Sequence, residues 1–246
     1  MRLRRLPGLL VVAALACACT QVGAAPDTPQ RAVMVLFDIS DSTAGATIRN
    51  RYLETFSRVL DFASQGGILA ADVIDSNPLA HSTFPVIERF RPYDPLTENS
   101  LTHRAKVGRA ETEAMDAAEG VTQHTDRGTD VFGGLELAAR FFANYPLAED
   151  RYLVVMSDML QSSGRMRFGS RLFSRTPPTT LLARVRDRIP DLSGVKVYVV
   201  GAGAPAFGRI DASTIHKIED FWLAYLRRTG ADAAADRYGA ALVRFP

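Results

Sequence analysis

The residues of this chain best suited to chemistry lie in one short run, Asp38-Ile39-Ser40-Asp41-Ser42. The run follows a continuous apolar stretch, residues 32–37, which predicts a strand buried on both faces. Alternate side chains of an extended backbone point the same way, so Asp38, Ser40 and Ser42 can converge on one point. That point would lie at the carboxyl end of a central strand, where open α/β sheets bind ligands.

Two further segments carry matching residue types. Gly128-Thr129-Asp130 precedes a predicted helix, and Ser157-Asp158 ends a predicted buried strand. In an alternating fold, strand ends and the adjoining turns meet along one edge of the sheet. Hydroxyl and carboxylate oxygens suit a hard cation, which would be Mg²⁺ above all, or Mn²⁺ or Ca²⁺. The alternative is structural, because Ser42 or Thr43 could simply cap the following helix.

This three-part pattern resembles the metal-ion-dependent adhesion site of von Willebrand factor A domains. The matching residues are Asp38, Ser40, Ser42, Thr129 and Asp158, and the resemblance extends over roughly residues 31–226. It implies direct metal binding by the two serine hydroxyls, binding by Thr129 directly or through water, and water-mediated roles for both aspartates. It also implies a binding protein, not an enzyme, whose cation accepts a carboxylate from another protein. The family often has a small residue at Asp41; this extra carboxylate could strengthen cation binding, but we expect it to face solvent.

Two other functions remain open on the sequence. A haloacid dehalogenase-like phosphatase would use Asp38 as its nucleophile, but its general acid would fall on Ser40, whose hydroxyl is far too weak an acid. A structural envelope lipoprotein with a degenerate metal site is the third interpretation, although all five residues of the pattern are intact.

The remaining candidate residues have weaker patterns. The four histidines show no ligand spacing and are predicted to lie on the surface or in loops: His81, His103, His124 and His216. Gly201-Ala202-Gly203 lacks the third glycine of a dinucleotide site and is predicted to be a turn. Four arginines follow Asp158 and form either a solvated loop or a rim that steers an acidic partner: Arg165, Arg167, Arg171 and Arg175.

The elements that must position these residues follow from hydrophobic periodicity. Helices are predicted over residues 43–64, 101–118, 131–142 and 180–189, with a last helix capped by Ser213. Strands are predicted over 32–37, 68–74, 83–90, 152–156, 195–200 and 241–245. The loop between 68–74 and 83–90 is too short for a crossover, and Pro85 suits an edge, so this pair should be antiparallel. The fold class is therefore α/β, Rossmann-like and doubly wound, with a mostly parallel central sheet, one antiparallel edge strand and helices on both faces.

The N-terminus predicts export. Arg2, Arg4 and Arg5 precede a short apolar run and small residues, as in a secretory signal over residues 1–25. Cys17 or Cys19 could carry a lipid anchor, and they are the only cysteines of the chain. A linker over 26–31 and one domain over 32–246 follow, with the periplasm or cell envelope as the expected location.

The charge of the chain also changes with export. Without residues 1–19 it has 26 basic and 27 acidic residues, so no nucleic-acid or anionic-membrane partner is predicted from its charge.

Overall fold

A computed structural model of the chain describes residues 29–164, 166–203, 210–242 and 245–246. These residues form one six-stranded sheet in the order β3-β2-β1-β4-β5-β6. The strands are β1 (Arg31–Asp38), β2 (Gly67–Ile74), β3 (Val86–Phe90), β4 (Asp150–Met156), β5 (Lys196–Val200) and β6 (Asp232–Gly239). The helices are α1 (Ala46–Ala63), α2 (Ser100–Thr122), α3 (Val131–Ala143), α4 (Ser170–Arg175), α5 (Pro178–Arg184) and α6 (Ala212–Arg228), with short 3₁₀ turns η1 (Pro78–Ala80) and η2 (Arg186–Arg188).

The sheet confirms the predicted fold class. Among the described strands only β3 runs antiparallel, against β2 at one edge, while β2, β1, β4, β5 and β6 pair in parallel. This also confirms the predicted antiparallel pair. Pro85 lies just before β3 and not within it, so no ladder hydrogen bond is lost to the missing proline N–H.

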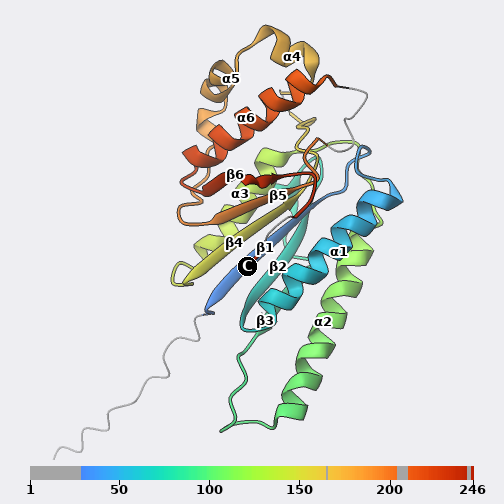
Figure 1. Cartoon of the computed structure of the whole chain (residues 1–246), viewed down its shortest axis with the longest axis vertical. Helices are drawn as coiled ribbons and strands as arrows, with labels where there is room; N and C mark the ends of the chain where they lie inside the picture. Colours follow the sequence, from blue (N-terminus) through green and yellow to red (C-terminus); the bar gives the residue numbers. More distant parts are fainter. Residues whose placement is uncertain (1–28, 165, 204–209, 243–244) are drawn as a thin grey trace, which may run out of the picture.

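Helices cover both faces of the sheet. Helices α1 and α2 lie on one face, and α3 and α6 lie on the other (Figure 1). Strand β1 is buried from Ala32 onward, which explains its unbroken apolar sequence, since a strand at the centre of a doubly covered sheet has no solvent side. On the α1 face Phe37 packs edge-on against Phe56, with ring centroids 5.4 Å apart. The core therefore has two layers, and β1 ends between them.

Three details of the predicted elements were wrong. The last strand is β6, over 232–239, not 241–245; residues 243–244 lie outside the described part of the chain. Its only apolar run is three alanines, because an edge strand is only half-buried and needs no large apolar side chains. The predicted helix over 180–189 is instead α5 followed by η2. Helix α6 is capped by Asp211, whose side chain accepts a hydrogen bond from the Thr214 N–H, while Ser213 lies inside the helix.

The predicted secretory signal and both cysteines lie outside the described residues, as does most of the predicted linker. The last residue of that linker, Arg31, already belongs to β1. Within the described residues, no helix combines the length and the apolar character needed to cross a bilayer.

Candidate metal centre

The end of strand β1 and the turn that follows it place acidic and hydroxyl side chains at the carboxyl edge of the sheet. The Asp38 carboxylate accepts a hydrogen bond from the Ser40 N–H (2.9 Å), which closes a tight turn directly after the strand. Ser40 Oγ lies 3.1 Å from Ser42 Oγ. The Ser40 and Ser42 hydroxyls thus lie side by side next to Asp38. A turn closed by the Thr43 N–H and the Ser40 carbonyl (3.0 Å) brings them together, and not the predicted alternation of an extended backbone.

The alternative capping role of Ser42 and Thr43 is wrong. Helix α1 has Gly45 as its N-cap, with no side-chain hydrogen bond to its first turn. The Thr43 hydroxyl instead donates to the Asp38 carbonyl oxygen, 2.7 Å away. Thr43 therefore stabilises the turn, and neither Ser42 nor Thr43 caps helix α1.

Strand β4 brings a second acid to the same point. The Ser157 hydroxyl donates to Asp38 Oδ2 (2.6 Å), so the ends of β1 and β4 are joined through their side chains. Asp158 follows and is buried, with 1% of its surface exposed. Asp158 Oδ1 accepts from the Leu160 N–H (2.9 Å), while Asp158 Oδ2 is buried and has no hydrogen-bond partner among the described residues.

The backbone bends sharply after Asp158. Met159 has a φ of +62°, in the left-handed region that non-glycine residues rarely occupy. Its N–H donates to the Ser157 hydroxyl and its carbonyl accepts from the indole N–H of Trp222. These two bonds hold the strained turn that aims Asp158 back toward β1.

The pKa values of both acids are raised. Burial first, and then the charge of Asp158, raise the pKa of Asp38 to about 7, against hydrogen bonds from Ser157 and Ser40 that lower it. Burial also raises the pKa of Asp158, opposed by the nearby Ser42 hydroxyl and the Leu160 N–H. No described lysine, arginine or histidine pairs with either carboxylate. Two buried acids that share a site without a basic partner are costly unless a proton or a cation neutralises them.

The loop over residues 123–130 completes this region, which we call the metal edge together with the ends of β1 and β4. Asp126 forms an isolated parallel bridge with Ser40 and donates its N–H to the Ile39 carbonyl (2.9 Å). Thr129 is buried, and its carbonyl accepts from the N–H groups of Ser162 and Ser163. Its backbone is thus held against the segment that follows Asp158, although no described contact joins its hydroxyl to the other four side chains.

Gly128 permits this close approach. A Cβ at position 128 would lie 2.6 Å from Ser163 Oγ and 2.8 Å from Ser76 Cβ, closer than side-chain atoms tolerate. Gly201, at the end of β5, has the same role with a φ of +97°, because a Cβ there would meet the Tyr52 hydroxyl at 3.0 Å.

Asp41 is exposed at the rim of this site, as expected. The described chain contains no cluster of three or more histidine, cysteine and acidic side chains placed to hold a metal. The five candidate residues are of another type, with two carboxylates and three hydroxyls. The buried Asp158 oxygen without a partner and the uncompensated acid pair fit a hard cation held by oxygen ligands.

No protein-family model matches the chain, and no curated protein matches it either. Two solved structures are similar to it at 13% identity: proximal thread matrix protein 1 from the mussel byssus, with a TM-score of 0.42 over 78% of this chain and 41% of that one, and a von Willebrand factor type A structure from Catenulispora acidiphila, with a TM-score of 0.38 over 82% and 43%. This chain therefore matches only about two fifths of the length of each of these two solved structures. At these TM-scores the function must be argued from the residues of this chain alone.

A second polar cluster was not predicted. His81, expected to be an ordinary surface or loop residue, lies between two acids, with Nδ1 2.9 Å from Asp72 Oδ1 and Nε2 3.0 Å from Asp75 Oδ2. Asp72 is buried inside β2, and its backbone partner in β1 is Leu36. Burial works to lower the pKa of His81, but the hydrogen bonds and charges of Asp75 and Asp72 outweigh it and raise the pKa.

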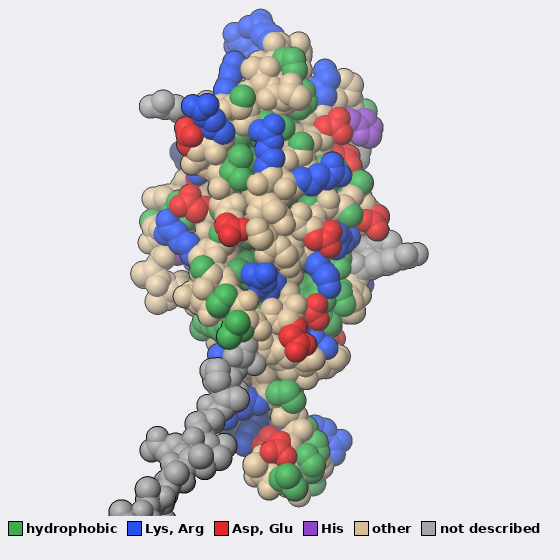
Figure 2. Space-filling view, turned by 90° about the vertical axis from the view of Figure 1, so that its left-hand side faces the viewer, with side chains coloured by type: hydrophobic (Ala, Val, Ile, Leu, Met, Phe, Trp, Pro, Cys, Tyr) green, Lys and Arg blue, Asp and Glu red, His purple; other side chains and the backbone are tan. Residues whose placement is uncertain are grey.

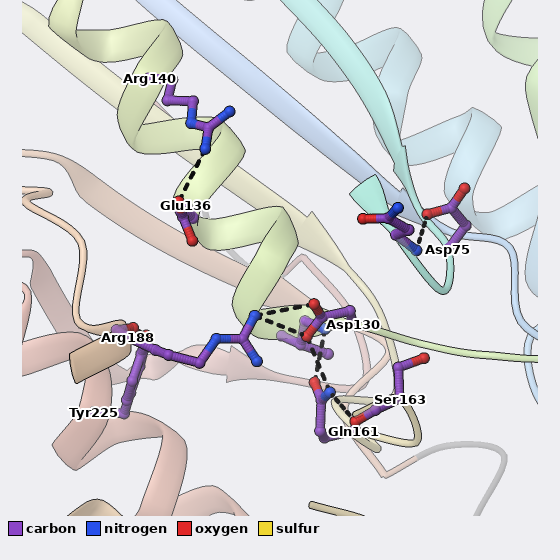
Figure 3. A network of polar contacts seen from close by, with 10 residues as sticks. Asp75, Asp130, Glu136, Arg140, Gln161, Ser163, Arg188 and Tyr225 are labelled. Atoms are coloured by element: carbon purple, nitrogen blue, oxygen red, sulfur yellow. Dashed lines mark hydrogen bonds and ion pairs between the residues drawn. The ribbon is translucent and has the colours of Figure 1, made fainter. Parts of the chain in front are cut away.

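Three residues beside the metal edge were also missed. The Gln161 side chain donates to Asp130 Oδ1 (3.0 Å) and accepts from the Val131 N–H (2.8 Å), so it joins the segment after β4 to the start of α3. Figure 3 shows this network, with Arg188 reaching Asp130 from the other side.

The missed Tyr52 hydroxyl is buried without a partner among the described residues, and its pKa is raised well above the ordinary value by burial and by Asp38 and Asp158. Ser157 was noted only as the neighbour of Asp158.

Proposed function

We propose that this chain binds a divalent cation at the metal edge and uses it to hold a carboxylate of a partner protein. The cation would be Mg²⁺, or Mn²⁺ or Ca²⁺, as suits an all-oxygen set. Ser40 and Ser42 would bind it directly, Thr129 directly or through water, and Asp38 and Asp158 through water. A cation held by few charged ligands keeps the capacity to accept an external carboxylate.

One observation carries the proposal. Asp38 and Asp158 are both buried and the charge of Asp158 raises the pKa of Asp38, yet Asp158 Oδ2 has no partner in the described chain. Buried acids are normally satisfied by hydrogen bonds or a basic group. Asp72 also has an unpartnered oxygen, but it contacts the basic His81, whereas no basic side chain of the described residues contacts Asp158. An ion that completes the coordination of the unpartnered Asp158 oxygen and neutralises the two acids explains this arrangement beside three hydroxyl side chains.

The same contacts favour binding over catalysis. Both oxygens of Asp38 already accept hydrogen bonds, from the Ser40 N–H and the Ser157 hydroxyl, and only 2% of the residue is exposed. A phosphatase nucleophile needs a free oxygen directed at its substrate. We therefore propose a protein-interaction module and no enzymatic activity.

The proposed setting is the cell envelope. Residues 1–25 would direct export to the periplasm, and Cys17 or Cys19 could attach the mature protein to a membrane through lipid. The proposed partner is another envelope protein with an accessible acidic side chain, and no nucleic acid is involved.

Capture from a cell-envelope extract tests the function. Immobilised wild-type protein should retain a partner in Mg²⁺ and release it in EDTA. Asp158→Ala should retain none, while Asp61→Ala, which removes an exposed acid on α1, should behave as wild type. A partner retained equally in EDTA, or by Asp158→Ala, would contradict the proposal.

A further inference from the structure

A second concave site opens beside the metal edge, between the start of α3, the segment after β4 and η2. Its volume is about 500 Å³. Phe132, Met166 and Val185 give it an apolar wall, and three arginines line it as well: Arg167, Arg184 and Arg188. We call it the arginine pocket. A concave site with an apolar wall and a few charged groups is typical of a binding site.

The three arginines are not equivalent. Arg188 pairs with Asp130 (3.0 Å), and its guanidinium lies 5.2 Å from the centre of the Phe132 ring. Its charge is therefore already balanced within the protein. Arg167 and Arg184 are exposed, and no carboxylate of the described chain pairs with either one. The pocket therefore carries two uncompensated positive charges, and lysine and arginine side chains are prominent at this end of the molecule (Figure 2).

The pocket and the metal edge share a wall. Gln161 lines the pocket, and its side chain donates to Asp130 Oδ1 and to the Ser163 carbonyl (2.9 Å). Asp130 directly follows Thr129, and the Thr129 carbonyl accepts from the Ser163 N–H (3.1 Å). Figure 3 shows Asp130, Gln161 and Ser163 together, with Arg188 on the pocket side. A ligand bound at one site therefore comes close to the other.

We propose that the arginine pocket binds an acidic segment of the partner protein, with an apolar side chain packed on Phe132 and Met166 and carboxylates paired with Arg167 and Arg184. Guanidinium groups suit carboxylates because their parallel N–H donors match the two oxygens. The inference rests on the proposed function in one respect, since it assigns one partner to both sites. It also narrows the partner to a protein with several acidic residues around an apolar one.

Fluorescence anisotropy with a labelled peptide of repeated Glu-Glu-Leu units tests the pocket, in EDTA so that no cation contributes. We expect wild type to bind the peptide and to bind its Gln-Gln-Leu counterpart much more weakly. The double variant Arg167→Ala/Arg184→Ala should weaken binding by about tenfold, the sum of two partly exposed charge pairs. Arg186→Ala is the matched control: this neighbouring arginine is 77% exposed, pairs only with Asp187 and does not line the pocket, so binding should not change. Thermal unfolding of each variant checks that the fold is retained.

The outcomes separate the two proposals. Arginine-dependent peptide binding that Mg²⁺ does not strengthen would support the pocket and count against the metal function. Binding that needs Mg²⁺ but is unchanged in the double variant would overturn the pocket and leave the metal function standing. Equal binding of the glutamine peptide, or binding of heparin with no binding of the acidic peptide, would also overturn the assignment.

Discussion

Two buried aspartates on neighbouring strands show how differently this fold treats an acid. Asp72 of β2 and Asp38 of β1 are both nearly inaccessible, and burial raises the pKa of each. Asp72 meets His81, which can supply a positive charge from within the chain. Asp38 meets Asp158, which adds a second negative charge. Asp72 Oδ2 and Asp158 Oδ2 are both buried without a hydrogen-bond partner among the described residues, so the clusters differ in charge and not in the number of orphaned oxygens. The first cluster can be neutralised by its own histidine, whereas the second needs a proton or, as we propose, a cation.

The largest expected difference concerns the response to a cation. If Mg²⁺ binds only the folded metal edge, a hundredfold excess over Kd should stabilise wild type by about 2.7 kcal/mol, equivalent to a rise in Tm of roughly 5–10 °C. Asp158→Ala should show no such rise, because truncation removes one of the acids that attract the ion. His81→Ala should keep the full rise. Loss of the Mg²⁺ response in His81→Ala would show that the two clusters are not independent.

The next effect concerns stability without a cation. His81→Ala should lower the free energy of unfolding by about 2 kcal/mol, because it leaves the buried Asp72 carboxylate without its side-chain partner. Urea denaturation in EDTA measures this. His216→Ala is the control, because that histidine is 77% exposed and should tolerate truncation. Equal stability of the two variants would mean that the Asp72 cluster does not support the fold.

Much of the metal edge could be predicted, and the reason is local. Asp38, Ser40 and Asp158 follow unbroken apolar strands, so the end of each strand and its position at the sheet edge can be read from the chain. Gln161 and Ser157 could not be predicted, since they bind backbone or side-chain groups brought close only by the fold. His81 was missed because Asp72 and Asp75 contact it from β2 and the segment following it, without any regular ligand spacing.

The outer parts of the fold were harder for a related reason. Strand β6 lies at the sheet edge, and its sequence of three alanines between charged residues lacks the long run of large apolar side chains that marks the central strands. The arginine pocket combines the start of α3 with the irregular segment after β4, the short helices α4 and α5, and η2, so no single periodicity indicates which side chains meet. The predicted arginine rim is divided by the fold. Arg167 lines the arginine pocket and a neighbouring hollow, while Arg171 and Arg175 line only that hollow. Arg165 lies outside the described residues.

The pH dependence of stability should also distinguish the clusters. The pKa of His81 is raised in the folded protein, so its contribution is complete below the unfolded pKa of about 6.5 and is lost as the pH rises through the folded value. The difference in unfolding free energy between wild type and His81→Ala should therefore shrink as the pH rises above about 6.5. Denaturation of both proteins across this range gives the result. A difference that grows with pH would reverse the assigned charge of His81.

The smallest effect is expected at Tyr52, whose hydroxyl is buried near both acids of the metal edge without a partner among the described residues. Tyr52→Phe removes only that hydroxyl and preserves the ring that packs in the core. Stability in EDTA should be unchanged or raised by up to about 1 kcal/mol, because no hydrogen bond is lost. A decrease in the free energy of unfolding of Tyr52→Phe would contradict this expectation and indicate that a water within the site satisfies the hydroxyl.

Calorimetric titration of the protein with Mn²⁺ tests the central claim most directly, with wild type compared with Ser40→Ala. Ser40 is uncharged, so its truncation leaves both acids in place and removes only a hydroxyl beside Ser42. The account predicts one binding site in wild type and at least about a tenfold loss of affinity in Ser40→Ala, as expected when a metal loses a ligand or its support. No binding by wild type, or equal binding by both proteins, would contradict the assignment of a cation to this edge of the sheet.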